Sequence, residues 1–427
     1  MPVAVLALVG LALLALGEPI GFALSIGTLA AQAANGDSLV LVPQRLFNGA
    51  DSFPLVAIPL FVITGQLMNT AGISRRLIAF ASALVGFVRG GLAHANVVVN
   101  MIMAEMSGSA VADAAALGTV MIPAMKSRGY PTNFAVALNS SAASIAIIIP
   151  PSIPMILYAV TAETSVSQLF IAGIVPGIIM GLAFMAYTYV LARRRNWPIE
   201  QRFSFREVGR TFVEALPSFL VPFIILGGIF SGIFTATESA GMALVTALAV
   251  GIFIHRELRF SDLPKLFLAA GIQTAVVMLI VAASAHMGSF ISNQQVPQRL
   301  AASLEALTRN PLLILLLMNV FLLFVGMVLH SAAAIVMVVP VVMPLIRAVG
   351  IDPIHFGIIM TLNMAIGQQT PPVASVLLTT CSIGRISVAD AMRVNVYFIM
   401  IMVLVTLLVT YVPPLSLTLP GLLGSGR

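Results

Sequence analysis

The sequence predicts an all-α protein that crosses a membrane several times, and three observations support this fold class. Hydrophobic residues fill 59% of the 427 positions and charged residues only 8%, too few to cover a soluble domain. Apolar segments of about 20 residues, each long enough to cross a bilayer, follow one another along the chain. Related blocks also recur in the two halves. The length accommodates on the order of ten spans and leaves little room for a soluble domain.

Charge placement predicts the orientation of the chain. Although the net charge is +6, the basic residues are scattered between apolar segments without an aromatic-basic face, so we expect a lipid bilayer and no nucleic acid as partner. The longest polar stretch, residues 193–214, holds six arginines and three glutamates. The positive-inside rule makes it a cytoplasmic linking arm. The apolar start has no basic n-region and is read as a retained first span, with the N-terminus outside.

Motifs for other chemistries are missing from the sequence. Cys381 is the only cysteine, which excludes a disulfide framework and a cysteine-based metal site. There is no HExxH pair and no GxSxG serine with a plausible histidine partner, so an intramembrane enzyme is disfavoured.

Two blocks repeat at nearly one offset. EPIGFAL at 18–24 matches ESAGMAL at 238–244, an offset of 220 (238 − 18). Pro123, Gly129 and Pro150-Pro151 match Pro344, Gly350 and Pro371-Pro372 at an offset of 221 (344 − 123). The basic loops put the Glu18 turn inside and the Glu238 turn outside. We therefore predict an inverted repeat, 1–192 and 215–427, an arrangement typical of secondary transporters.

Each half contains a small-residue segment between short apolar runs. These segments are SGSAVADAAALG at 107–118 and HSAAAIVMVV at 330–339. We predict two re-entrant hairpins, at about 94–128 and 312–346, whose small residues let the backbone approach a ligand closely. The alternative is that these residues only allow close helix packing.

Each half also contains a helix interrupted by Pro-Pro. LNSSAASIAIIIPPS at 138–152 and LNMAIGQQTPPVAS at 362–375 predict two broken helices, at about 132–160 and 354–380. Proline leaves upstream carbonyls without helical partners, and such oxygens suit Na⁺. The N-termini of half-helices favour a carboxylate. This combination predicts Na⁺-coupled transport of an organic anion.

Several motifs together resemble the large membrane subunit of TRAP transporters, the DctM family, over nearly the whole chain. They are SGSAVADAAALG, IIIPPSIPMILYA (147–159), SGIFTATESAG (231–241), GIDPIHFGIIM (350–360) and IGQQTPPVASVL (366–377). The resemblance implies an elevator-type transporter, with a scaffold and a transport domain, in a bacterial-type inner membrane with a periplasmic N-terminus. The implied partners are a small four-helix membrane subunit and a periplasmic substrate-binding protein. The implied substrate is a C4-dicarboxylate or a sialic-acid-like carboxylate.

The same resemblance implies site residues. Two or more Na⁺ ions are expected, one at Ser107, Ser109, Asn139, Ile145 and Pro150, and another at Gly326, Gly367, Thr370 and Val373. Substrate is expected near Ser109, Asn139, Ser331, Asn363 and Gln368.

Some polar residues have more than one interpretation. Asn139 and Asn363 can instead be hydrogen-bonding links between helices. Glu105 and Asp113 are either functional or solvated near Lys126 and Arg128. His330 is either a coupling group or a packed histidine, and the expected role of Glu18 and Glu238 is helix capping. The alternative function is a stand-alone Na⁺/dicarboxylate elevator carrier that needs no binding protein.

Overall fold

The computed structural model describes residues 2–200, 202–299, 308 and 310–424, and every regular element in that part is helical. The prediction of an all-α chain is confirmed for these residues. Eight of their helices are long and apolar enough to cross a membrane. These are Phe53–Thr70, Val166–Arg194, Phe205–Phe230, Ala236–Ile254, Leu263–Asn293, Pro311–Val328, Ser331–Ala348 and Val388–Tyr411.

The first half begins with short helices and continues through a hairpin and a broken helix. Its elements are α1 (Pro2–Ala15), α2 (Ile20–Asn35), η1 (Leu39–Leu41), α3 (Val42–Ala50), η2 (Phe53–Val56), α4 (Ala57–Thr70) and α5 (Ile73–Val85). The hairpin is α6 (Gly91–Ser107) and α7 (Ala110–Ser127). The broken helix is α8 (Thr132–Ala143), η3 (Ser144–Ile147) and α9 (Ile153–Thr161), and α10 (Val166–Arg194) follows it.

The second half begins with longer helices and then follows the same order. Its elements are α11 (Phe205–Phe230), α12 (Ala236–Ala249), η4 (Val250–Ile254) and α13 (Leu263–Asn293). The hairpin is α15 (Pro311–Val328) and α16 (Ser331–Ala348). The broken helix is α17 (Pro353–Gly367) and α18 (Ser375–Gly384), followed by α19 (Val388–Tyr411) and α20 (Pro414–Gly424).

Helix bounds recur in the two halves at one spacing. α7 and α16 begin 221 positions apart (331 − 110) and end 221 positions apart (348 − 127). α6 and α15 end at that spacing (328 − 107), and α8 and α17 begin at it (353 − 132). The peptide bonds Pro150–Pro151 and Pro371–Pro372 are both cis.

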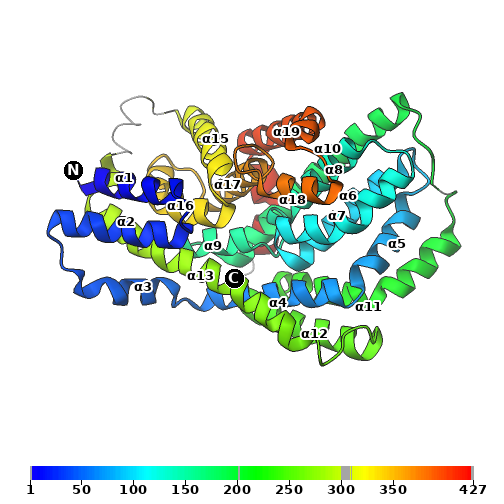
Figure 1. The fold of residues 1–427 in the computed structure, drawn as a ribbon, viewed down its shortest axis with the longest axis horizontal. Coiled ribbons are helices and arrows are strands. Elements are labelled where there is room, and N and C mark those ends of the chain that lie inside the picture. Colours follow the sequence, from blue (N-terminus) through cyan, green and yellow to red (C-terminus); the bar gives the residue numbers. More distant parts are fainter. Residues whose placement is uncertain (1, 201, 300–307, 309, 425–427) are drawn as a thin grey trace.

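The helices divide into two sets by their contacts. We call α6–α10 and α15–α20 the inner set, and α1–α5 with α11–α13 the outer set. Within the inner set, each half packs on the other: α9 contacts α16, and α18 contacts α7 and α8. In Figure 1, α1–α3 lie at one end of the long axis and α5 and α11 at the other, with α9, α17 and α18 between them. The outer set contacts the inner set chiefly through α5 against α6 and α13 against α16.

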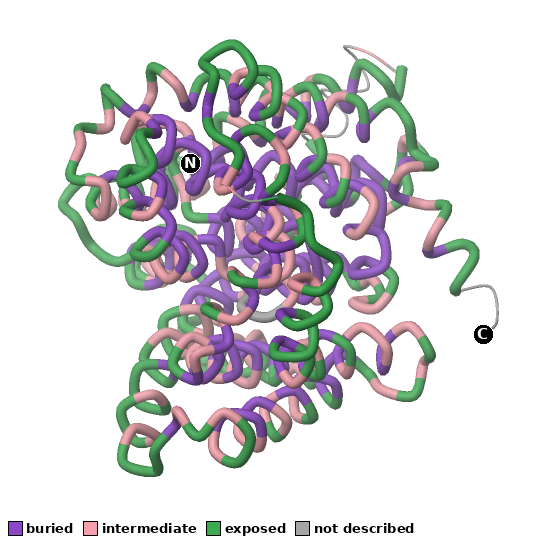
Figure 2. Tube along the Cα trace, turned by 90° about the vertical axis from the view of Figure 1, so that its right-hand side faces the viewer, coloured by how far each residue is buried: buried purple, intermediate pink, exposed green. Residues whose placement is uncertain are grey.

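The two broken helices form the most deeply buried part of the fold. Every residue is buried from Phe134 to Ala159 and from Ile354 to Gln369. Figure 2 shows buried residues concentrated in the interior, with exposed ones along the outer helices and turns. Interruptions of a helix are tolerated at membrane depth only where protein or an aqueous cavity surrounds them, so this burial is what the sequence of the breaks requires.

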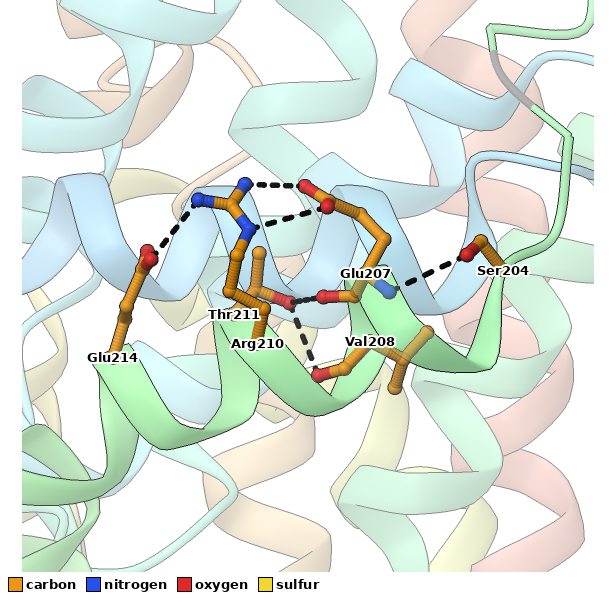
Figure 3. A network of polar contacts seen from close by, with 6 residues as sticks. All are labelled: Ser204, Glu207, Val208, Arg210, Thr211 and Glu214. Carbon is orange, nitrogen blue, oxygen red and sulfur yellow. Dashed lines mark hydrogen bonds and ion pairs between the residues drawn. The ribbon is translucent and has the colours of Figure 1, made fainter.

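The predicted linking arm is shorter than expected. Residues 205–214 already belong to α11, so only 195–204 connect it to α10. Ser204 caps the helix, since its Oγ accepts from the Glu207 amide at 3.4 Å (Figure 3). Arg210 then bridges Glu207, at 2.5 Å, and Glu214, at 3.0 Å, one turn away on either side. Of the charges that suggested a loop, Arg206, Glu207, Arg210 and Glu214 therefore belong to the first turns of α11, whereas Arg195, Glu200 and Arg202 lie in the connection.

The role of Glu238 as a capping residue is confirmed. Thr235 Oγ1 accepts from the Glu238 amide at 3.2 Å, and Glu238 Oε2 accepts from the Thr235 amide at 2.8 Å, which is a capping box. Glu18 has no such role in the structure, because Pro19 is the N-cap residue of α2 and makes no side-chain cap bond.

Loss of this cap has a predictable cost. We expect Thr235→Ala to lower the free energy of unfolding by about 1 kcal/mol, the usual value of an N-cap hydroxyl. The matched control is Thr246→Ala in the same helix, whose hydroxyl only donates to the Met242 carbonyl at 2.7 Å. Unfolding in detergent, followed by circular dichroism, measures both variants. Equal effects of the two substitutions would contradict the capping role.

Candidate functional site

A small cavity lies where the two hairpin turns meet. Its volume is about 50 Å³, and it opens between the turn of the α6–α7 hairpin, the start of α16 and the start of α9. α13 of the outer set closes one wall with Gln273 and Val277. The polar side chains in its lining are Ser109, Gln273, His330, Ser331 and Gln368.

Three helix N-termini reach this cavity. α7 is capped by Ser109, whose Oγ accepts from the Ala112 amide at 3.4 Å, and α9 by Ser152, whose Oγ accepts from the Met155 amide at 3.4 Å. α16 begins at Ser331 after the N-cap residue His330. Helix N-termini carry partial positive charge and free amide hydrogens, so the site is arranged to bind an anion such as a carboxylate.

Each hairpin turn contacts the Pro-Pro break of its own half. At Gly108, which has φ +59°, an added Cβ would lie 2.8 Å from the Pro151 carbonyl oxygen. In the second half, the Val373 amide donates to the Met327 carbonyl at 3.2 Å. A shift of either break therefore moves a wall of the cavity.

Three of the five predicted substrate residues line the cavity: Ser109, Ser331 and Gln368. Gln368 Nε2 donates to Ser331 Oγ at 2.8 Å, which joins the second break to the start of α16. Its Oε1 is buried and has no hydrogen-bond partner among the described residues. This oxygen is available to select a polar group of a ligand.

Asn139 and Asn363, the other two predicted substrate residues, are not among the residues that line this cavity. Their amide nitrogens link helices: Asn139 Nδ2 donates to the Ala114 carbonyl at 3.1 Å, and Asn363 Nδ2 to Asn319 Oδ1 at 2.8 Å. Both Oδ1 atoms are buried without a hydrogen-bond partner in the part of the chain that the structure describes. Buried amide oxygens of this kind are expensive unless something binds them, and a cation is a suitable partner.

The first predicted ion set is gathered around the first break. η3 contacts both α6 and α7, and α8 contacts α7, so the segments that contain or adjoin Ser109, Asn139, Ile145 and Pro150 pack against one another. The Ile145 carbonyl is not the unused acceptor that the sequence predicted. It accepts from the amides of Ile148 at 2.8 Å and Ile149 at 2.9 Å, because the chain tightens into a 3₁₀ turn before the prolines. The side chain of Ser107 lies outside the described part of the structure.

The second predicted ion set is brought together more closely. Gly326 of α15 and Gly367 of α17 touch through their backbones, since a Cβ added to Gly367 would lie 2.3 Å from the Gly326 carbonyl oxygen. Thr370 Oγ1 donates to the Ile366 carbonyl at 2.9 Å, and Val373 is tied to Met327. Backbone and hydroxyl oxygens from α15, α17 and the break thus meet at one place.

Comparison with known proteins decides the family. The family model described as "Tripartite ATP-independent periplasmic transporter, DctM component" matches residues 7–415. The chain belongs to the DctM family. This is a family of transporter permeases and not of enzymes, in agreement with the resemblance seen in the sequence motifs.

Two curated relatives of this chain carry different substrate names. It is 40% identical over 93% of both chains to the C4-dicarboxylate TRAP transporter large permease protein DctM of Pseudomonas aeruginosa. It is 38% identical over 98% of both chains to the sialic acid TRAP transporter large permease protein SiaM of Vibrio cholerae. Among solved structures, the YdaH transporter of Alcanivorax borkumensis has the same fold, with a TM-score of 0.60, 14% identity and coverage of 91% of this chain and 88% of that one.

The acidic residues of the membrane segments lie in separate surroundings. Asp113 is fully buried in the first turn of α7, and Arg128 pairs with Glu200 at 2.8 Å. The solvated interpretation of Asp113 is therefore wrong. Glu105 lies on α6 and lines a second cavity of about 470 Å³ whose other lining residues are apolar. Among the described residues there is no group of three or more His, Cys, Asp or Glu that could hold a metal ion.

Two buried amides that bond to residues beside the breaks, Asn319 and Gln369, were not predicted from the sequence. Asn319 holds the Asn363 amide, and Gln369 binds residues of the first break. Asn319 could have been noticed as a lone amide inside an apolar run, since intramembrane polar residues are functional candidates. Gln369 follows Gln368 directly, and the sequence alone does not tell which of two adjacent amides faces the cavity.

Proposed function

We propose that this TRAP large subunit carries out Na⁺-coupled uptake of an organic acid by an elevator mechanism. The observation that supports the anion site is the cavity between the hairpin turns, where α7, α9 and α16 begin. The names of the two relatives both refer to carboxylates, which favours a C4-dicarboxylate or a sialic-acid-like substrate.

The small size of the cavity supports a mechanism in which its walls move apart to admit the substrate. At about 50 Å³ it holds only a few waters. A C4-dicarboxylate does not fit until the walls separate. The wall from α13 belongs to the outer set, so sliding the inner set past α13 would open the same cavity to one side of the membrane and then to the other.

The proposed moving part is the inner set, and the proposed scaffold is the outer set. In this proposal the hairpins α6–α7 and α15–α16 are re-entrant, and the halves 1–192 and 215–427 are an inverted repeat. The constant spacing of 221 positions between corresponding helix bounds supports the repeat. The reciprocal packing of α9 on α16 and of α18 on α7 supports a two-fold relation.

The proposed coupling ion is Na⁺, and the residues present fit it. The unpartnered oxygens Asn139 Oδ1 and Asn363 Oδ1 lie beside the two breaks. Neutral oxygen ligands suit a hard cation without burying a net negative charge. We assign one ion to Ser109, Asn139 and Pro150, and another to Gly326, Gly367, Thr370 and Val373.

The proposed setting is a bacterial-type inner membrane. The N-terminus would be periplasmic, and the arginine-rich stretch 193–214 cytoplasmic. The proposed partners are a small four-helix membrane subunit and a periplasmic binding protein that delivers the substrate. Membership of the DctM family does not favour the stand-alone carrier.

Uptake into proteoliposomes tests the proposal. We expect the chain, reconstituted with its co-encoded small subunit, to accumulate a labelled C4-dicarboxylate or sialic acid only with an inward Na⁺ gradient and the cognate binding protein. A K⁺ gradient of equal size is the control. Uptake without the binding protein would favour the stand-alone carrier. Uptake that does not depend on the Na⁺ gradient would refute Na⁺ coupling.

A further inference from the structure

Gln369 joins the two broken helices through its side chain. Its Nε2 donates to the Ser140 carbonyl at 2.8 Å and to Ser144 Oγ. Its Oε1 accepts from Ser140 Oγ at 2.6 Å. All three residues are fully buried. These bonds run from the second break, after α17, to the end of α8 and the 3₁₀ turn of the first break.

Asn395 of α19 completes the network. Its Oδ1 accepts from Ser141 Oγ at 3.0 Å, and its Nδ2 donates to the Gln369 carbonyl at 3.2 Å. Both the side chain and the backbone of Gln369 are therefore held by groups that have no exposure to water. Hydrogen bonds at such sites are strong, and a buried network of this kind defines one geometry.

On each side of this link, one neighbour in the chain belongs to a proposed cation set. Gln369 lies between Gln368, which binds Ser331, and Thr370 of the second set. On the other side, Ser140 follows Asn139 of the first set. A single side chain thus connects the backbone at one proposed site to the backbone at the other.

We propose that Gln369 is a positioning residue that couples the two cation sites, so that Na⁺ at one break favours Na⁺ at the other. This inference rests on the proposed function. Gln369 lies outside α-helix, in the turn at 368–373, and its partners lie in the last turn of α8 (Ser140) and in the 3₁₀ turn that follows it (Ser144), so an ion bound at either break can order the segment beside it. Ordering one segment orders the other through Gln369, which makes the second ion bind more tightly.

Direct binding of ²²Na⁺ tests the coupling without any organic substrate. For the wild-type chain in nanodiscs we expect two ions and a Hill coefficient approaching about 2, the number of coupled sites. For Gln369→Leu we expect two ions still, a Hill coefficient of about 1, and half-saturation at a Na⁺ concentration raised about five-fold or more, the lower range of such couplings.

The matched control is Gln32→Leu. Gln32 is also a buried glutamine that links two helices, with Oε1 3.1 Å from His286 Nε2, but it belongs to the outer set. We expect its Hill coefficient to equal that of the wild type. A merely structural Gln369 would lower the thermal stability of the variant and leave the Hill coefficient unchanged, and that result would overturn the inference.

Three other outcomes of the binding experiment distinguish failure of the coupling from failure of the proposed function. If Gln369→Leu does not fold, Ser144→Ala removes one bond of the Gln369 side chain, and an unchanged Hill coefficient there would overturn the coupling. Independent binding of two ions by the wild type would overturn the coupling and leave the proposed function intact. Absence of Na⁺ binding by the wild type would instead reject the Na⁺ coupling of the proposed function, and with it this inference.

Discussion

Replacing Gly367 by alanine should abolish Na⁺-dependent uptake and destabilise the chain by about 3 kcal/mol or more, the upper range for overpacking in a core. The added Cβ would lie 2.3 Å from both the carbonyl carbon and the carbonyl oxygen of Gly326. Both are backbone atoms, so no side-chain rotation relieves the contact. α15 and α17 must separate, and the oxygens assigned to the second ion separate with them.

Gly326→Ala, at the same contact between α15 and α17, should lower stability and uptake less than Gly367→Ala does. Its Cβ would lie 3.3 Å from the Asn363 carbonyl oxygen and 3.3 Å from Gly367 Cα, a tighter contact than usual but one that a small shift relieves. The matched control is Gly241→Ala in α12, where an added Cβ meets nothing within 4 Å. Alanine there is neutral or stabilising by up to about 1 kcal/mol. Thermal unfolding in nanodiscs and uptake measure all three variants, and equal behaviour of Gly367→Ala and Gly241→Ala would refute the close-contact argument.

Patterns that depend on composition and periodicity predicted the fold well. The apolar segments, the Pro-Pro breaks and the small-residue segments each lie where the structure has a long helix, an interruption or a hairpin turn. The linking arm was the main error, because a charged run is compatible with both a loop and an exposed helix face. Ser204 followed three positions later by Glu207 was the signal of a helix start at that place.

The candidate site was only partly predictable. The sequence identifies polar residues near the breaks, but the direction in which each side chain points depends on how the two halves pack. Gln368 and Gln369 are adjacent, yet one binds Ser331 and the other binds Ser140. Asn139 and Asn363 both begin a broken stretch, but they are 224 positions apart (363 − 139), not 221 as the helices are, and they bond to different helices of their hairpins. Tertiary packing, which the sequence pattern does not encode locally, decides these roles.

Thr370→Val should weaken Na⁺ binding at the second site by about 10- to 100-fold, the range seen when a metal site loses even an outer partner. Thr370 Oγ1 gives its proton to the Ile366 carbonyl at 2.9 Å. A hydroxyl in that arrangement keeps its lone pairs for a cation, whereas valine has the same shape without the oxygen. Thr370→Ser retains the oxygen and should bind Na⁺ almost as the wild type does.

Thr379→Val is the matched control for this substitution. Thr379 is also half-buried, and its Oγ1 donates to the Ser375 carbonyl, again four residues back and at 2.9 Å. Removal of this hydroxyl costs the same hydrogen bond but touches no residue of either ion set. The Na⁺ concentration for half-maximal uptake should therefore rise only in Thr370→Val. A similar rise in both variants would mean that Thr370 stabilises its helix end and does not bind the ion.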